Sequence, residues 1–310
     1  MRIPIPVPEV GFVIGYLIED AAGAVHAIDP GWDDDTTWEL LASALARFGK
    51  DIADIASIAS THLHFDHYGM APRLGRATGA RVRLGGADRE IVRANIEMGG
   101  DAEPPLERWG VPRTYGSEMR TATRNRIVVA ADADADLAGD MDLGLPGRAL
   151  RTLATPGHTP GHTSLIDDTA RIVFTGDHLL RDSFPGIGLG GPDDPRPIER
   201  YFRSLAALLR LDGYRVCPGH EGSFDDLVPR VRQTAEHHLH RSREVAALVD
   251  SGASLSVWET ASRLSWGAGF ANLRGMRLRS ALAQTAMHID FVETPFARRL
   301  LERGVDALEE

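Results

Sequence analysis

Residues 60–69 read "STHLHFDHYG", and this stretch decides how the rest of the chain is interpreted. It holds three of the 12 histidines and one aspartate, all between His62 and His67. Neutral imidazole and carboxylate groups are ligands for borderline cations such as zinc. The alternatives are a solvated loop or side chains that cap a helix. A metal site requires further ligands from distant parts of the chain.

Short apolar segments elsewhere end in such residues. The segment "IASIAST" leads into the histidine cluster, and three more segments lead to His158, Asp177 and His220. A glycine stands directly before each of these three residues, where it lets the backbone turn sharply and approach a ligand. Loops at the edge of a β core are where binding sites are commonly built. The sequence therefore predicts one site assembled from four junctions between a strand and a loop.

Seven residues make up the predicted ligand set. We assign His62, His64 and His158 to one cation, Asp66, His67 and His220 to a second, and Asp177 to a bridge between them. Alternate positions 62 and 64 face the same way in an extended segment, whereas 66 and 67 need a turn. Two cations about 3.5–4 Å apart clamp a water and lower its pKa. We expect two divalent cations, with zinc first and iron or manganese as alternatives.

The motifs "THLHFDH", "PGHTPGH", "TGD" and "PGH" resemble those of the metallo-β-lactamase superfamily over roughly residues 5–225. This resemblance implies an α/β fold, the αββα sandwich, with a two-metal site along one edge. All seven predicted ligands match ligand positions of the family. The resemblance also implies hydrolysis by a metal-bound hydroxide, with Asp66 orienting that water or accepting its proton. Asp66 followed by His67 is similar to glyoxalase II, lactonase and ribonuclease relatives.

The chain changes character after about residue 225, where alternating strands and helices give way to helices. We predict a catalytic domain over residues 1–225 and a helical C-terminal module over 226–310. The module resembles a winged-helix-type domain of the lactamase-β-like branch, although "FARRLLERGVDALEE" reads as helix where a β wing is expected. Residues 99–124 are rich in Gly and Pro and are predicted to form an insert or lid with short helices.

The sequence leaves the roles of two histidines near the ligands undecided. His178 is a catalytic candidate together with Asp66, because it could donate a hydrogen bond to an oxyanion or hold Asp177. A buried structural histidine is the equal alternative. His162 is predicted to be structural or to support a ligand, since His158 has the matching spacing.

Aromatic residues and methionines are candidates for the substrate pocket. Tyr68 stands beside the ligands, and Trp109, Tyr115, Met98 and Met119 belong to or border the insert. Together they could form an apolar wall over an acyl group. For each of them, packing within a core is the alternative.

The composition of the chain limits the kinds of partner and compartment that we expect for it. The formal net charge of -10 argues against a general affinity for nucleic acid, which needs a basic face. The single cysteine, Cys217, excludes an intramolecular disulfide and fits a reducing compartment. The N-terminal apolar run lacks the features of a signal peptide, and no stretch of about 18 apolar residues predicts a membrane span. We therefore expect a cytoplasmic protein that does not act on membranes.

Three functions are compatible with these features. The leading one is a dinuclear-metal hydrolase for a small or medium ester-type substrate: a thioester, a lactone or a carboxylic ester. The alternative is an endoribonuclease or phosphodiesterase acting on single-stranded RNA, with arginines in "RLRSALAQ" and "HLHRSRE" as candidate contacts. A non-catalytic metal-binding scaffold is the third, and a complete ligand set argues against it. A homodimer is left open.

Overall fold

Two β-sheets form the centre of the computed structural model, which describes residues 1–8, 11–98, 105–124, 131–190 and 194–309. The first sheet has the strand order β1 (Arg2–Val7), β2 (Gly11–Glu19), β3 (Val25–Ile28), β4 (Ile55–Ala59), β5 (Arg81–Gly85) and β6 (Ala135–Leu137). The second has the order β10 (Arg215–Pro218), β9 (Ile172–Gly176), β8 (Thr163–Asp167) and β7 (Leu150–Ala154). Strands β3 to β6 are parallel, as are β9 and β10, and the other neighbours are antiparallel.

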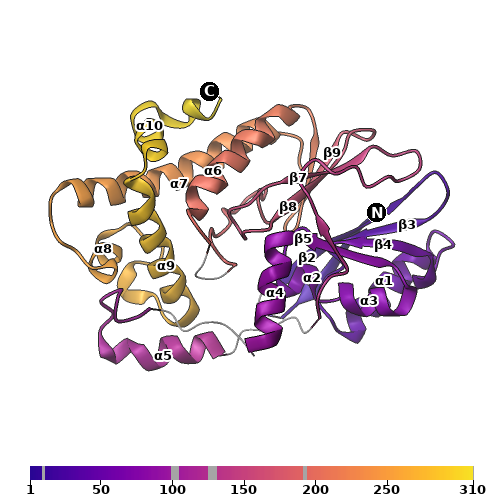
Figure 1. Cartoon of the computed structure of the whole chain (residues 1–310), viewed down its shortest axis with the longest axis horizontal. Helices are drawn as coiled ribbons and strands as arrows, with labels where there is room; N and C mark the ends of the chain where they lie inside the picture. Colours follow the sequence, from indigo (N-terminus) through magenta and orange to yellow (C-terminus); the bar gives the residue numbers. More distant parts are fainter. Residues whose placement is uncertain (9–10, 99–104, 125–130, 191–193, 310) are drawn as a thin grey trace.

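Helices cover the outer face of each sheet (Figure 1). Helices α1 (Asp35–Ala46) and α3 (Ala71–Thr78) share one core with the first sheet, whereas α6 (Pro197–Leu208) and α7 (Leu227–Asp250) share another with the second. A third core lies between the sheets, where the rings of Tyr16 and Phe174 meet edge to face at 5.0 Å. The layers follow the order helix, sheet, sheet, helix, so the predicted αββα fold is confirmed.

Two N-terminal elements show how local sequence sets the first sheet. Strand β1 alternates exposed and buried residues, and its two prolines fall on exposed positions of an edge strand, where no ladder donor is needed. Residues 2–7 were not predicted to form a strand. Helix α1 has Asp34 as its N-cap, since the Asp34 carboxylate accepts a hydrogen bond of 2.7 Å from the Thr37 N–H.

The C-terminal region is helical, as predicted. After α7 come α8 (Val257–Arg263), α9 (Gly275–Val292) and α10 (Pro295–Arg303). Within residues 219–309 the structure contains no strand, so the winged-helix resemblance is not shown. The rings of Phe202 on α6 and Phe291 on α9 stack at 5.6 Å, and these helices therefore continue the outer helical layer of the second sheet. Among the described residues, no helix has the length and hydrophobicity to cross a membrane.

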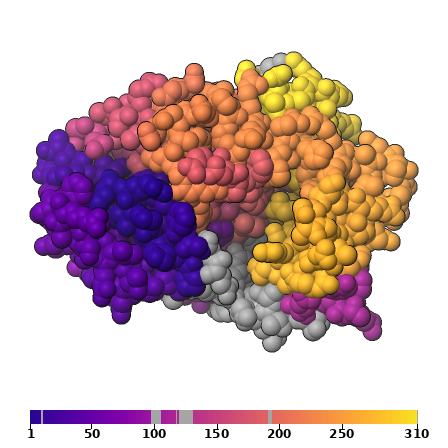
Figure 2. All heavy atoms as spheres, turned by 180° about the vertical axis from the view of Figure 1, so that it is seen from behind, coloured from indigo at the N-terminus to yellow at the C-terminus, as the bar shows by residue number. Residues whose placement is uncertain are grey.

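The insert packs against the C-terminal helices. Its helix α5 (Arg113–Arg124) contributes to a small core with α8 and α9, in which Tyr115 and Trp258 lie 4.9 Å apart. Residues 99–104 of the predicted lid lie outside the described part of the chain. Seen from behind, the surface is hollowed between the indigo N-terminal segment and the gold C-terminal helices (Figure 2).

Close backbone contact between the end of β5 and a loop of the second sheet gives a test of the packing. A Cβ on Gly85 would lie 1.8 Å from the carbonyl oxygen of Gly161. We expect Gly85→Ala to lower the free energy of unfolding by about 1–3 kcal/mol, the usual cost of overpacking. Urea denaturation measures the change. Gly267→Ala is the control, because no atom lies within 4 Å of a Cβ there. Equal stability of the two variants would contradict the backbone contact.

Candidate metal centre

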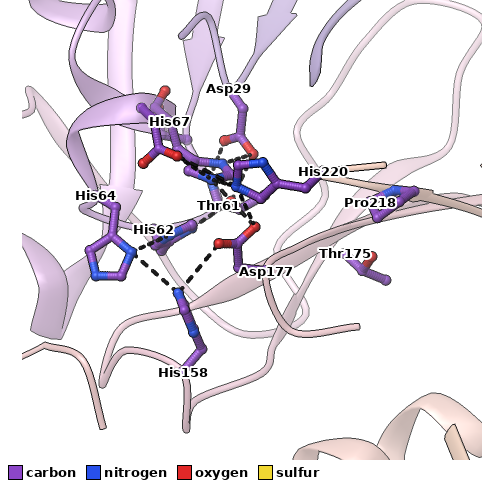
Figure 3. A network of polar contacts seen from close by, with 12 residues as sticks. Asp29, Thr61, His62, His64, His67, His158, Thr175, Asp177, Pro218 and His220 are labelled. Carbon is purple, nitrogen blue, oxygen red and sulfur yellow. Dashed lines mark hydrogen bonds and ion pairs between the residues drawn. The ribbon is translucent and has the colours of Figure 1, made fainter. Parts of the chain in front are cut away.

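The predicted ligands meet at one edge of the sandwich, where several strands end (Figure 3). His62 and His64 follow β4, Asp177 follows β9, and His220 follows β10. The single turn of helix α2 (Phe65–Tyr68) supplies the bend that sequence analysis required at positions 66 and 67. The ligand atoms form two groups, each within 4.8 Å: His62, His64, His158 and Asp177, and Asp66, His67 and His220. The structure therefore brings all seven predicted ligands together.

The tautomer of His62 follows from its neighbours. Thr61 Oγ1 lies 2.8 Å from a carboxylate oxygen of Asp29, to which it donates its hydrogen. His62 Nδ1 lies 3.0 Å from the same hydroxyl and must donate to it. The Nε2 atom of His62 therefore carries a lone pair, and it points into the first cluster.

The other two histidines of the first cluster are held by backbone carbonyls. His158 Nδ1 donates to the Gly186 carbonyl at 2.7 Å, and His64 Nε2 donates to the Leu189 carbonyl at 3.2 Å. Each neutral ring then presents its remaining nitrogen as a lone pair. His64 Nδ1 lies 2.9 Å from His62 Nε2 and 3.2 Å from His158 Nε2. Three lone pairs converge on one point, and this arrangement suits a cation.

The second cluster repeats this arrangement. His67 Nδ1 donates to the Asp29 carboxylate at 2.9 Å, and His220 Nδ1 donates to the Phe12 carbonyl at 2.7 Å. The two Nε2 atoms face each other at 3.4 Å. Asp66 Oδ2 lies 3.4 Å from His220 Nε2. These groups form a second set of N and O ligands.

Asp177 lies between the two clusters. Its Oδ1 atom is 3.4 Å from His67 Nε2 and 3.3 Å from His220 Nε2, whereas its Oδ2 atom is 3.6 Å from His158 Nε2. One carboxylate oxygen thus faces each cluster. This is the geometry expected of a bridging ligand.

Electrostatics distinguish the clusters. Burial lowers the pKa of His62 well below its ordinary value, so this ring is a neutral ligand. Burial opposes charge on His220, but Asp177 and Asp66 outweigh it and raise the pKa of His220 to about 10. Burial also opposes charge on Asp177, yet His67 and His220 hold the pKa of Asp177 well below its usual range. The second cluster therefore favours a positive charge, whether a proton or a cation.

Sequence analysis missed two buried aspartates that support the ligands. Asp29 accepts hydrogen bonds from His67 and from Thr61, so it stands behind both clusters. Its position at the end of β3, directly before Pro30 and Gly31, was an available signal of the kind used for the other ligands.

The second is Asp88 on α4 (Gly86–Met98), whose carboxylate accepts from Leu63 N at 2.9 Å, Thr159 Oγ1 at 2.7 Å and Gly161 N at 2.6 Å. It joins the loop of His62 and His64 to the loop of His158. No local sequence pattern predicts this role of Asp88.

The two histidines with open roles are both buried. His162 Nδ1 hydrogen-bonds to Thr155 Oγ1 at 2.8 Å, and its ring stacks on His62 with centroids 5.2 Å apart. These contacts fit the predicted structural role. Neither ring nitrogen of His178 has a hydrogen-bond partner in the described structure, and burial lowers its pKa to about 3. Its ring packs 4.5 Å from Tyr201, which fits the structural alternative rather than a hydrogen bond to Asp177.

The pocket candidates have packing partners of their own. Tyr68 is fully buried in the core of the first sheet and donates its hydroxyl hydrogen to the Ala131 carbonyl at 3.0 Å, so it packs rather than lines a pocket. Trp109, Tyr115 and Met119 belong to the small core shared with the C-terminal helices. The side chain of Met98 lies outside the described part. A substrate contact by Trp109 or Tyr115 stays a prediction.

Comparison with known proteins agrees with this geometry. Residues 10–220 match the family described as Metallo-beta-lactamase superfamily. The probable metallo-hydrolase YqjP of Bacillus subtilis is 24% identical over 303 residues, covering 94% of this chain and 91% of that protein. The crystal structure of the metallo-beta-lactamase family protein TTHA1429 from Thermus thermophilus is 27% identical, with a TM-score of 0.75, and the match covers 94% of this chain and 92% of that one.

Two further relatives have names that state an activity. Hydroxyacylglutathione hydrolase of Anaeromyxobacter dehalogenans is 31% identical over 213 residues, which cover 68% of this chain and 62% of that protein. N-acyl homoserine lactonase AttM of Azorhizobium caulinodans is 26% identical over 246 residues, which cover 71% of this chain and 82% of that protein.

The two clusters predict the cation content. We expect protein purified without added metal to contain more than one equivalent of divalent cation, most of it zinc. His158→Ala removes one of the three converging imidazoles and should lower the content to about one equivalent, because an incomplete site binds weakly. Elemental analysis measures this. His240→Ala on the exposed side of α7 is the control. An unchanged content in His158→Ala would contradict the assignment of this ligand.

The position of Asp29 behind both clusters gives a second prediction. Asp29→Asn should weaken the binding of both cations by about 10–100-fold each, the usual effect of losing a residue that orients a ligand. Titration of metal-stripped protein with Zn²⁺ measures both affinities. Asp140→Asn is a matched control at an exposed position that also has a positive φ. Wild-type affinity at both sites would show that Asp29 does not orient the ligands.

Proposed function

The chain belongs to the metallo-beta-lactamase superfamily and is a metal-dependent hydrolase, and we propose that it cleaves an ester-type bond in a small or medium-sized substrate. The bond would be a thioester, a lactone or a carboxylic ester. The observation that carries the proposal is the convergence of five imidazole nitrogens and two carboxylates on two adjacent points. Two relatives act, by their names, on an acylglutathione and on a homoserine lactone. Both substrates contain an acyl carbon bound to a sulfur or oxygen leaving group.

The side chains present fit two divalent cations, since neutral imidazoles and carboxylates suit zinc, iron or manganese. When bound, such cations polarise a carbonyl group and lower the pKa of a water between them. His62, His64 and His158 would hold the first cation, and Asp66, His67 and His220 the second, with Asp177 between them.

Asp66 combines two tasks in this proposal. Its Oδ2 atom faces His220, and the side chain is 8% exposed, so it lies at the second cluster and is shielded from bulk water. A carboxylate in this position can orient the attacking water and accept its proton. When the tetrahedral intermediate collapses, the leaving thiolate or alkoxide takes up a proton. We assign that proton to Asp66, which would then return to its ionised form.

The proposal predicts a large effect at Asp66. Asp66→Asn should lower kcat roughly 10²–10⁴-fold, because the amide cannot accept a proton. The assay uses saturating Zn²⁺, so that weaker cation binding does not account for the loss. The substrates are an acylglutathione, an N-acyl homoserine lactone, an aryl ester and single-stranded RNA, each with and without chelator.

Asp140→Asn again serves as the exposed control and should keep wild-type kcat. Chelator-sensitive hydrolysis of at least one ester is the expected result. Asp66→Asn with near-normal turnover would refute the proposed proton transfer. Cleavage of RNA without hydrolysis of any ester would favour the phosphodiesterase alternative instead.

A further inference from the structure

One loop fixes the orientation of two ligands in the first cluster. We define the 180s loop as residues 180–190. It carries the Gly186 and Leu189 carbonyls, which accept the N–H groups of His158 and His64. The backbone of the loop also donates to the carbonyls of Gly157 and His158, at 2.7 and 2.8 Å. Displacement of the loop would therefore rotate both rings and turn their lone pairs away from the cluster.

Helix α7 holds the beginning of this loop. Arg230 donates from Nε to the Leu180 carbonyl at 2.6 Å and from Nη2 to the Ser183 carbonyl. Its guanidinium lies 4.6 Å from the ring of Phe184, and the residue is only 6% exposed. It forms no ion pair with a described carboxylate. A buried charge without such a partner is costly. Here the guanidinium gives two hydrogen bonds to the loop and a third, from Nη1, to Gln233 Oε1 on the same helix at 2.5 Å.

Helix α9 holds the end of the loop. Gln284 Nε2 donates to the carbonyl of Ile187, the residue after Gly186. Next to it, Gly188 has φ +69°, and a Cβ there would lie 2.5 Å from Met287 on the same helix. Both contacts fall between Gly186 and Leu189. Helix α9 thus touches the loop at the segment that carries the two ligand-orienting carbonyls.

The second cluster is held from elsewhere. His67 is oriented by Asp29 after β3, and His220 by the Phe12 carbonyl on β2. These acceptors belong to the N-terminal part of the first sheet. Among the described residues, the 180s loop supplies ligand-orienting carbonyls to the first cluster and none to the second.

We propose that Arg230 and Gln284 are positioning residues for the first cation cluster, through which the C-terminal helices set its affinity for metal. They act through the 180s loop on His158 and His64, and none of their described hydrogen bonds goes to a ligand. The inference rests on the two-cation site of the proposed function, and it needs no particular substrate.

The two residues differ in how selective their effect should be. Glu221, next to His220, accepts from the N–H groups of Asp182 and Ser183, at 2.5 and 3.0 Å. The beginning of the loop is therefore also linked to the second cluster, so a change at Arg230 can reach both sites. Gln284 holds the end of the loop and is the cleaner probe.

The test uses full-length protein stripped of metal and titrated with Zn²⁺ by calorimetry and with Co²⁺ by visible absorption. Gln284→Leu removes the donor and keeps the size of the side chain. It should weaken the first cation about 10–100-fold, as for other groups that orient ligands, and leave the second nearly unchanged. The Co²⁺ bands of the first site should shift. His158→Ala identifies which binding step and bands belong to this site.

Arg232→Met is the matched control, because Arg232 is two residues from Arg230 on α7 and pairs only with Asp306 and Glu309 among described residues. It should bind both cations as the wild type does. Arg230→Lys should restore most of the affinity that Arg230→Met loses. The inference is overturned if Gln284→Leu binds both cations normally, or if both affinities fall equally with a lower melting temperature of the metal-stripped protein. Failure of every ester substrate would refute the proposed function and leave this result intact.

Discussion

The convergence of five imidazole rings and two carboxylates at one edge of the sandwich is the constraint on which the rest of the structure depends. Each histidine has one nitrogen engaged by an acceptor on its outer side, so its other nitrogen faces the centre, where it can offer a lone pair to a cation. Lone pairs and carboxylates that face one another inside a protein repel and have lost their hydration. A cation at each cluster relieves both costs. The site is therefore organised to bind cations, and the acceptors behind the rings orient the ligand nitrogens toward them.

The sandwich supplies these acceptors because its strand ends and loops meet closely at this edge. The clearest case is the contact of Gly85 with Gly161, where two backbones touch without an intervening side chain. That contact brings α4 near the His158 loop, and Asp88 can then bind Leu63 and Gly161 at once. Close packing of this glycine pair therefore fixes the distance between two loops that carry or support ligands. A looser junction would leave the imidazoles free to turn.

The C-terminal helices pack against this arrangement. They share a core with α6 and the second sheet, and the described part of the insert packs on their other side. Sequence analysis assigned Trp109 and Tyr115 to a wall over the substrate because large apolar side chains in an irregular segment suggest a lid. Their partners in this small core, such as Trp258 on α8 and Leu282 on α9, lie more than 100 residues away in the sequence, and no local pattern could identify them. Strand β1 was not predicted either. Proline is tolerated in edge strands, and only the tertiary structure shows that β1 lies at the edge of its sheet.

The sequence by itself determined the ligand set, the alternation of strands and helices and the helical C-terminal region. Each of these depends on residues close together in the chain: a histidine motif, a glycine before a ligand, or a periodic run of apolar residues. Only the tertiary structure decided which nitrogen of each histidine faces the centre and how Asp177 divides its oxygens between the clusters. The acceptor that orients His220 is the carbonyl of Phe12, 208 residues away. Such a backbone carbonyl has no signature in the sequence, because every residue has one and only the fold brings the right one into place.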